Sequence, residues 1–256
     1  MMNLLAFAPA PTDLTNGVKS PESPYFWLPA DASMANYRFA LSATQVPWYL
    51  WNSARVALLA TALTLAVGVP AAYVLSREGF RGRGAALASL LTVQMISPII
   101  LLVPIYSVIA ALRLLDTHSG LVLVYAAIQV PFTVTVLKTF FDAVPPQVLE
   151  AARLDGATRA RTLLQVALPV VAPGLAATAI FNLAAYWSEF SLALVLLDSQ
   201  QRFTIPVGLF SFQSGYETDW QLVAAASFIG LVPVMAVFVL LQRFFVAGLT
   251  AGAVKG

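Results

Sequence analysis

The sequence contains no cysteine and only one histidine, His118, among its 256 residues. Without cysteine there is no disulfide, thiol nucleophile or thiolate metal site, and a single histidine removes His-pair metal sites and most catalytic triads. Charged side chains make up only 10% of the chain, against about 25% in soluble domains. The net charge of +2 is too small to indicate a nucleic-acid partner. These scarcities exclude a water-soluble enzyme.

Apolar residues are abundant, at 59% of the chain, and the mean hydropathy is +0.81. A helix needs about 20 apolar residues to cross roughly 30 Å of hydrocarbon. The sequence therefore predicts an all-α fold, a polytopic membrane helix bundle in the lipid bilayer. Pro98 and Pro104 are expected to kink its second span. The five predicted transmembrane helices cover residues 54–75, 85–112, 120–141, 170–197 and 221–242.

Basic residues are concentrated in two connections, 76–84 and 142–168, which carry three arginines each. Because Lys and Arg gather in cytoplasmic loops, we predict that both connections and the C-terminus are cytoplasmic. Residues 51–256 then form the transmembrane domain, and residues 1–50 form an extracytoplasmic N-terminal segment. This polar segment would have to cross the membrane without a preceding helix, which is unfavourable. A first helix is therefore expected to be missing upstream. A genuine five-helix protein is the alternative.

The connection at 142–169 is long for a compact bundle, and long ordered connections tend to be functional. Its composition favours a helix over 147–155, which Gly156 can end in a left-handed conformation. Thr158 can cap a second helix, 159–167, expected to stop at the following Leu-Pro pair. Two short helices that meet at a glycine predict a compact projection, called the knob below. An ordinary amphipathic connector is the alternative.

The residues of the knob follow a spaced pattern. Glu150-Ala151-Ala152 is followed after three residues by Gly156, and after nine more by Val166-Ala167-Leu168-Pro169. This pattern resembles the EAA loop of ABC importer permeases, the membrane subunits of ATP-driven importers. The resemblance implies that the knob couples the chain to an ATPase through Glu150, Ala151, Ala152, Asp155, Gly156, Leu168 and Pro169.

The resemblance extends to the maltose-type carbohydrate permeases, over roughly residues 30–256. It is carried by Asn36-Tyr37, by Trp187-Ser188-Glu189-Phe190 and by the ending TAGAVKG. Two features depart from that family: its usual first helix is not found, and Ser188 stands where these proteins often have Asn. The resemblance implies a type I ABC importer permease fold in the plasma (inner) membrane. It also implies that the subunit is not an enzyme and helps to import a sugar or related carbohydrate.

The same resemblance implies a set of partners. These are a second homologous permease, two ABC ATPase subunits and an extracytoplasmic solute-binding protein. ATP and Mg²⁺ are expected in the ATPase subunits only. The chain lacks a Gly-x-x-x-x-Gly-Lys phosphate loop, so it is expected to bind no cofactor or metal itself.

Glu189 is the outstanding charge inside a predicted span, about two thirds along the fourth. A carboxylate at bilayer depth is costly, so it should face a polar interior. One interpretation is that it accepts hydrogen bonds from sugar hydroxyls beside aromatic rings. The alternative is a structural bond, and the amides are equally compatible with helix packing. The candidate substrate path comprises Glu189, Trp187, Tyr186, Asn182 and Gln94.

Two other classes of transporter and one class of enzyme are the alternatives. An ABC permease for a non-sugar solute, such as a glycerol phosphate, has the same appearance. A secondary transporter should show two repeated halves and paired intramembrane acids, whereas this sequence offers only Glu189 and no evident repeat. An intramembrane enzyme would need clustered His, Asp or Ser within the bilayer, and the one histidine lies in a loop.

Overall fold

The computed structural model describes residues 34–212 and 220–253. Every regular element in these ranges is a helix, which confirms the predicted all-α fold. Residues 1–33, most of the predicted N-terminal segment, and residues 213–219 lie outside the described ranges. The last residues of that predicted segment belong to two helices, because α2 covers Ala35–Ser42 and α3 already begins at Val46.

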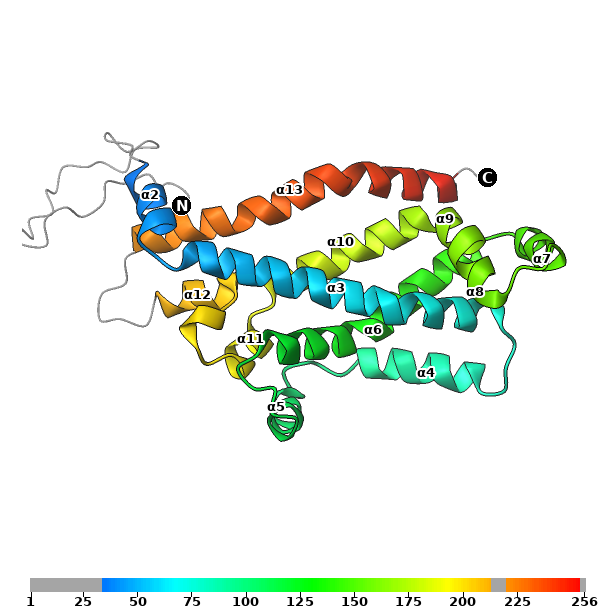
Figure 1. The fold of residues 1–256 in the computed structure, drawn as a ribbon, viewed down its shortest axis with the longest axis horizontal. Coiled ribbons are helices and arrows are strands. Elements are labelled where there is room, and N and C mark those ends of the chain that lie inside the picture. Colours follow the sequence, from blue (N-terminus) through cyan, green and yellow to red (C-terminus); the bar gives the residue numbers. More distant parts are fainter. Residues whose placement is uncertain (1–33, 213–219, 254–256) are drawn as a thin grey trace, which may run out of the picture.

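Four helices form the body of the bundle (Figure 1). Helices α3 and α6 lie side by side, and α10 and α13 pack beside them. Their bounds are Val46–Arg77 for α3, His118–Asp142 for α6, Ala172–Ser188 for α10 and Trp220–Ala253 for α13. In the described ranges, α3, α6 and Trp220–Val237 of α13 are long and apolar enough to cross a membrane. The bent pair Arg159–Val170 and Ala172–Ser188 would make a fourth span.

Short helices gather at the two ends of the bundle (Figure 1). One end carries α2, α11, the 3-10 helix η2 and α12, where the last three cover Ser191–Leu196, Gln200–Arg202 and Ile205–Ser211. The other end carries the knob, made of α7, α8, the π-helical turn η1 and α9. These cover Pro146–Leu154, Arg159–Arg161, Thr162–Ala167 and Leu168–Val170.

The second predicted span is not one kinked helix, and this expectation is corrected. Helix α4 ends at Gln94, and α5 begins only at Leu102, covering Leu102–Ala111 after the Arg83–Gln94 of α4. The physical reason lies at Pro98, which lacks an N–H and disfavours helical backbone at Ser97 before it. Pro104 lies in the first turn of α5, where proline is tolerated.

The fourth predicted span also differs from expectation. Helix α10 ends at Ser188, and the chain turns through Glu189 and Phe190 before α11 begins. At its other end, the second helix of the knob does not stop at Leu168-Pro169 but continues to Val170. A π-helical turn precedes Pro169, which lies in the first turn of α9, where proline is tolerated.

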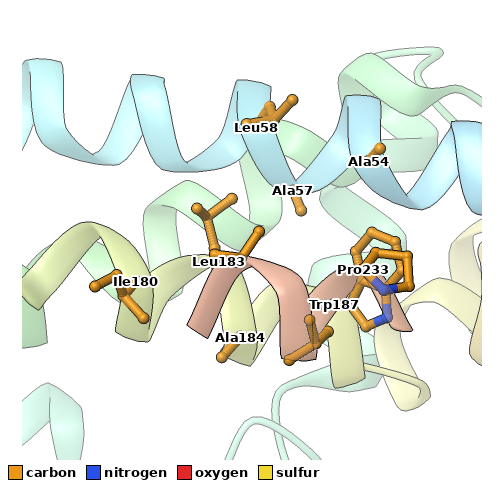
Figure 2. A pocket seen from close by; sticks show the side chains of 10 residues that line it. Ala54, Ala57, Leu58, Ile180, Leu183, Ala184, Trp187 and Pro233 are labelled. Atoms are coloured by element: carbon orange, nitrogen blue, oxygen red, sulfur yellow. The ribbon is translucent and has the colours of Figure 1, made fainter. Parts of the chain in front are cut away.

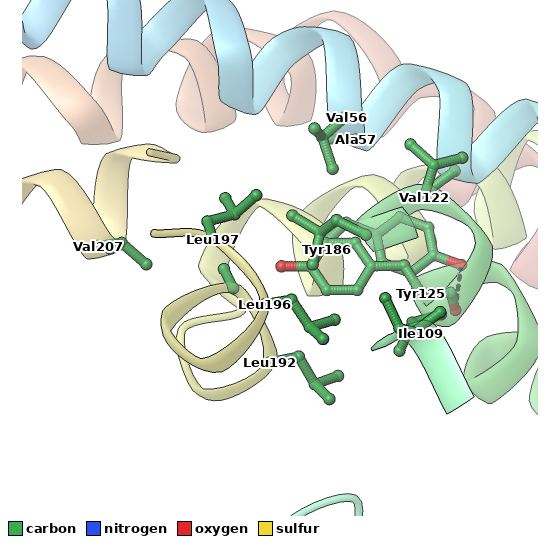
Figure 3. Close-up of a cluster of buried hydrophobic side chains, with 14 residues drawn as sticks. Val56, Ala57, Ile109, Val122, Tyr125, Tyr186, Leu192, Leu196, Leu197 and Val207 are labelled. Carbon is green, nitrogen blue, oxygen red and sulfur yellow. Dashed lines mark hydrogen bonds between the residues drawn. The ribbon is translucent and has the colours of Figure 1, made fainter. Parts of the chain in front are cut away.

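Four apolar clusters join the described helices, and two of them lie beside the sites discussed below. The first lies toward the α11 end and joins α3, α6, α10 and α11 around the stacked rings of Tyr125 and Tyr186 (Figure 3). The second lies toward the knob end and includes Tyr73 of α3 and Phe141 of α6. Within a bilayer, helices are held together mainly by close van der Waals packing of such side chains. The second cluster positions the knob.

Candidate coupling knob and membrane site

The knob has the local structure that its sequence predicts at the junction between its helices. Pro146 occupies the first turn of α7, where its missing N–H costs nothing. Gly156 has a φ of +81°, so it lies in the left-handed region that favours glycine. The hydroxyl of Thr158 accepts a hydrogen bond from the N–H of Arg161 at 3.3 Å and caps α8. The two short helices therefore meet at Gly156.

The base of the knob is anchored in the second apolar cluster. Leu149 is the buried residue of α7, and Ala167 of η1 is fully buried on the other arm. Both pack with Phe141 and Tyr73, whose rings meet edge to face at 5.5 Å between centroids. Both arms of the knob therefore rest on the ends of α3 and α6.

The outer part of the knob is exposed and partly apolar. Leu154 is 89% exposed and Leu164 is 60% exposed. The knob therefore presents large apolar side chains on its surface. Of the predicted coupling residues, Ala152 and Leu168 are half-buried, and the others are exposed: Glu150, Ala151, Asp155, Gly156 and Pro169.

Two residues that the sequence analysis did not single out, at the end of α3, contact the knob and the segment that leads into it. The guanidinium of Arg77 donates hydrogen bonds to the carbonyl oxygens of Phe141 and Val144, where the chain leaves α6. The carboxylate of Glu78 pairs with Arg153 at 3.3 Å and with Arg159 at 3.6 Å. The available signal was that Glu78 is the one acid in the arginine-rich connection at 76–84.

Glu189 is bonded within this chain. Its carboxylate accepts hydrogen bonds from the hydroxyl of Tyr125 at 2.7 Å and from the backbone N–H groups of Leu192 and Ala193 at 2.8 and 3.2 Å. It therefore lies at a break between helices and caps α11. These three bonds favour the structural role that the sequence analysis left open.

Tyr186 and Asn182 are buried inside this chain. The ring of Tyr186 stacks on Tyr125, with centroids 5.2 Å apart, and its hydroxyl lies 2.7 Å from that of Thr64. The amide of Asn182 donates to Thr133 at 3.0 Å and accepts from Gln129 at 3.2 Å. Both side chains join helices of the bundle and present no free polar group to a passing solute.

Trp187 lines a hollow between α3, α10 and α13 (Figure 2). The hollow holds about 180 Å³, and its other lining residues are aliphatic or proline. The indole N–H of Trp187 donates to the carbonyl oxygen of Gly230 at 3.0 Å, so its polar group is already used. A sugar needs several hydrogen-bonding partners, and this hollow offers none of them. A hydrocarbon chain fits this apolar hollow better than a sugar does.

Gln94 differs from the other four candidates because its side chain is exposed. It is the last residue of α4, directly before the break at residues 95–101. Its amide donates to the carbonyl oxygen of Leu90 at 3.0 Å and to the hydroxyl of Thr135 in α6 at 3.2 Å. The structure therefore does not bring the five candidates into one site: Gln94 lies apart from the Tyr125–Glu189 cluster.

At the opposite end from the knob, Asp116 binds the connection after α11. Its carboxylate accepts hydrogen bonds from Ser199 and Asp198 and pairs with Arg202 at 3.1 Å. Burial acts to raise the pKa of Asp116, but these hydrogen bonds and the charge of Arg202 outweigh it, and the pKa lies below its ordinary value. His118 bonds to the carbonyl oxygen of Arg202 at 2.9 Å. This end of the bundle is therefore tied together.

The described part of the chain is a bundle of membrane-length apolar helices that carries the knob at one end. Residues 64–250 match the family of the binding-protein-dependent transport system inner membrane component. The chain belongs to this family. It is a multi-pass, non-catalytic permease subunit of an ABC importer, and its motor lies in separate subunits.

Several curated proteins are similar along most of the chain. The sulfoquinovosyl glycerol transport system permease protein SmoH of Agrobacterium fabrum is 36% identical, over 96% of this chain and 86% of its own length. The diacetylchitobiose uptake system permease protein DasC of Streptomyces coelicolor is 34% identical, over 90% and 83%. The trehalose/maltose transport system permease protein MalG of Thermococcus litoralis is 36% identical, over 88% and 82%.

Solved structures share the fold at low sequence identity. A chain of a bacterial ABC transporter involved in the import of alginate aligns with a TM-score of 0.78, at 20% identity, over 95% of this chain and 88% of that one. A chain of the MetNI methionine ABC transporter aligns with a TM-score of 0.62, at 18% identity, over 78% and 94%. The type I importer permease fold expected from the sequence is confirmed.

Proposed function

We propose that the chain is a membrane subunit through which a sugar or related carbohydrate enters the cell. Three relatives that cover most of the chain carry names for sulfoquinovosyl glycerol, diacetylchitobiose and trehalose/maltose transport, which supports a glycoside as the class of solute. The three names give different sugars, so uptake measurements are needed to identify the solute that this chain transports. A glycerol phosphate is the alternative solute.

The knob is the observation that carries the coupling role. Its backbone turns at Gly156, its base is buried among α3 and α6, and its outer surface exposes Leu154 and Ala151. A partly apolar projection with a buried base fits a cleft in an ABC ATPase subunit. ATP and Mg²⁺ are bound by two such subunits, and closure of the ATPases moves the knob. A second homologous permease and an extracytoplasmic binding protein complete the proposed complex.

The orientation follows from charge. Glu78 and Arg153 pair directly, so the two arginine-rich connections lie at the same end of the bundle. We place this end and the C-terminus in the cytoplasm, where Lys and Arg accumulate. Reporter fusions after Gly82 and Gly156 should then be cytoplasmic, while a fusion after Thr117 should be external. The reverse pattern at these sites would reject the docking of the ATPases.

The substrate path is proposed along the face where the exposed Gln94 meets the half-buried Thr135. These side chains come from α4 and α6 and meet at the break between α4 and α5. The face is exposed in this chain, so a second permease could enclose it from the other side. Glu189, Tyr186, Asn182 and Trp187 support the walls of the bundle instead, because their polar groups are bonded within the chain.

Gly156→Asp in the purified complex tests the coupling role. A side chain in the left-handed region costs about 1–2 kcal/mol, and no atom of this chain lies within 4 Å of the added Cβ. The bundle should therefore insert and pair normally, while the ATPase subunits are lost or stop responding to the loaded binding protein. Uptake of trehalose, maltose and diacetylchitobiose into proteoliposomes identifies the solute. Full retention of both ATPases and of transport in Gly156→Asp would reject the proposal.

A further inference from the structure

The knob is part of the same continuous chain as α6 and α10, but it has no direct covalent connection to α3. Helix α6 leads into α7, and α9 leads into α10. Helix α3 runs the length of the bundle beside α6 (Figure 1). Any movement of the knob therefore reaches α3 only through contacts between side chains or backbone groups. The contacts at the end of α3 decide whether that helix follows the knob.

Glu78 makes the contacts nearest the tip of the knob. Arg153 lies three residues before Gly156 on α7, and Arg159 lies three residues after it on α8. One oxygen of the Glu78 carboxylate is 3.3 Å from Arg153, and the other is 3.6 Å from Arg159. A single carboxylate therefore spans both arms of the turn. The apolar cluster, by contrast, holds the knob only at its base, through residues such as Leu149 and Ala167.

The position of Glu78 is unfavourable without these partners. It directly follows the last turn of α3, where the negative end of the helix dipole opposes a carboxylate. The space beside it is also loosely filled, because a hollow of about 550 Å³ lies between the end of α3 and α8, with Tyr73, Phe80 and Leu163 among its lining residues. The ion pairs bridge the edge of this hollow.

We propose that Glu78 is a positioning residue that makes the tip of the knob and the end of α3 move as one body. The inference rests on the proposed docking of the knob in an ATPase subunit. When the ATPases close, the knob carries α3 with it through Glu78, and α3 in turn shifts the helices that pack on it. Ion pairs as exposed as these add little to folding stability, so the loss of Glu78 affects coupling and leaves assembly intact.

The first test is Glu78→Gln, which keeps the shape of the side chain and removes its charge. In the complete complex, both ATPase subunits and basal ATP hydrolysis should be retained. Sugar transported per ATP hydrolysed should fall roughly 2- to 30-fold, the range expected for a change in coupling between sites. Arg161→Gln is the matched control, because Arg161 bonds only within its own arm, to Gln165 at 2.8 Å. Equal coupling in Glu78→Gln and wild type would overturn the proposal.

The second test restores the link covalently. The chain has no cysteine, so Glu78→Cys with Arg153→Cys introduces a single pair. The reduced pair should be poorly coupled, and a short, reducible bifunctional thiol reagent should restore transport driven by ATP. If the cross-linked complex stops transporting, the knob must move relative to α3 and the proposal is wrong. Gly156→Asp separates the two ideas: if it loses the ATPases while Glu78→Gln behaves as wild type, only the role of Glu78 fails.

Discussion

The hydroxyl of Tyr125 donates a hydrogen bond to Oε2 of Glu189 across 2.7 Å, and the same oxygen accepts the N–H of Ala193. The bond joins the middle of α6 to the turn that starts α11. A carboxylate held by a phenol and two backbone amides has few acceptor positions left for a solute. Glu189 therefore stabilises the junction of these helices.

Glu189→Ala should destabilise the complex without changing the KM for sugar uptake. The variant leaves the N–H groups of Leu192 and Ala193 without their acceptor, which costs about 0.5–2 kcal/mol for a lost cap. Tyr125→Phe is the matched control, since it removes one of the same bonds from the other side. Thermal unfolding in detergent should show a smaller loss for Tyr125→Phe. A raised KM with unchanged stability in Glu189→Ala would instead place Glu189 in the substrate path.

Apolar replacements of Gln94 and of Asn182 should affect different properties: the KM for uptake and the stability of the protein, respectively. Gln94→Leu removes an exposed amide from the proposed path and should raise the KM for uptake about 5- to 10-fold, as expected for one lost hydrogen bond. Asn182→Val removes a fully buried amide and should lower stability by roughly 0.6–1.7 kcal/mol, with the KM unchanged. Uptake kinetics and thermal unfolding of both variants separate the two roles. An unchanged KM in Gln94→Leu removes it from the path.

Gly208→Ala should disrupt the contact between α12 and α3. A Cβ at Gly208 would overlap the ring of Tyr49, which is fully buried. Overpacking of this kind costs about 1–3 kcal/mol. Gly84→Ala in α4 is the control, because no atom lies within 4 Å of its added Cβ. The control should be neutral or up to about 1 kcal/mol more stable. Equal melting temperatures for the two variants would contradict the packing of α12 on Tyr49.

The hydrogen bonds and the ion pair of the Asp116 carboxylate should be lost in acid. The pKa of Asp116 is lower in the folded protein than in the unfolded chain. The contacts of its carboxylate therefore contribute fully to stability when the pH is above the ordinary pKa of aspartate. That contribution disappears as the pH falls below about 4 and through the lowered pKa. Asp116→Asn should therefore melt at a lower temperature than wild type at pH 7 and 5. The difference should shrink as the pH is lowered from 5 to 3. A constant difference down to pH 3 would contradict the assigned pKa direction.

The sequence determined the knob because the signals there are local. A proline in the first helical turn, a glycine in the left-handed region and a capping threonine each depend on neighbours only a few residues away. Pro146, Gly156 and Thr158 therefore specify the turn before any long-range contact forms. Composition likewise determined the membrane class, since the count of apolar residues needs no knowledge of which helices touch.

Only the tertiary structure decided what the polar membrane residues do. Glu189 and Gln94 are both isolated polar groups in apolar sequence, yet one is bonded to Tyr125, 64 residues away in the chain, and the other is exposed beside Thr135. The pairing of Glu78 with Arg153 spans 75 residues. Which partners meet over such separations depends on how α3, α6 and α10 pack, because the energy of a polar group in a bilayer is set by the atoms it contacts and not by its neighbours in sequence.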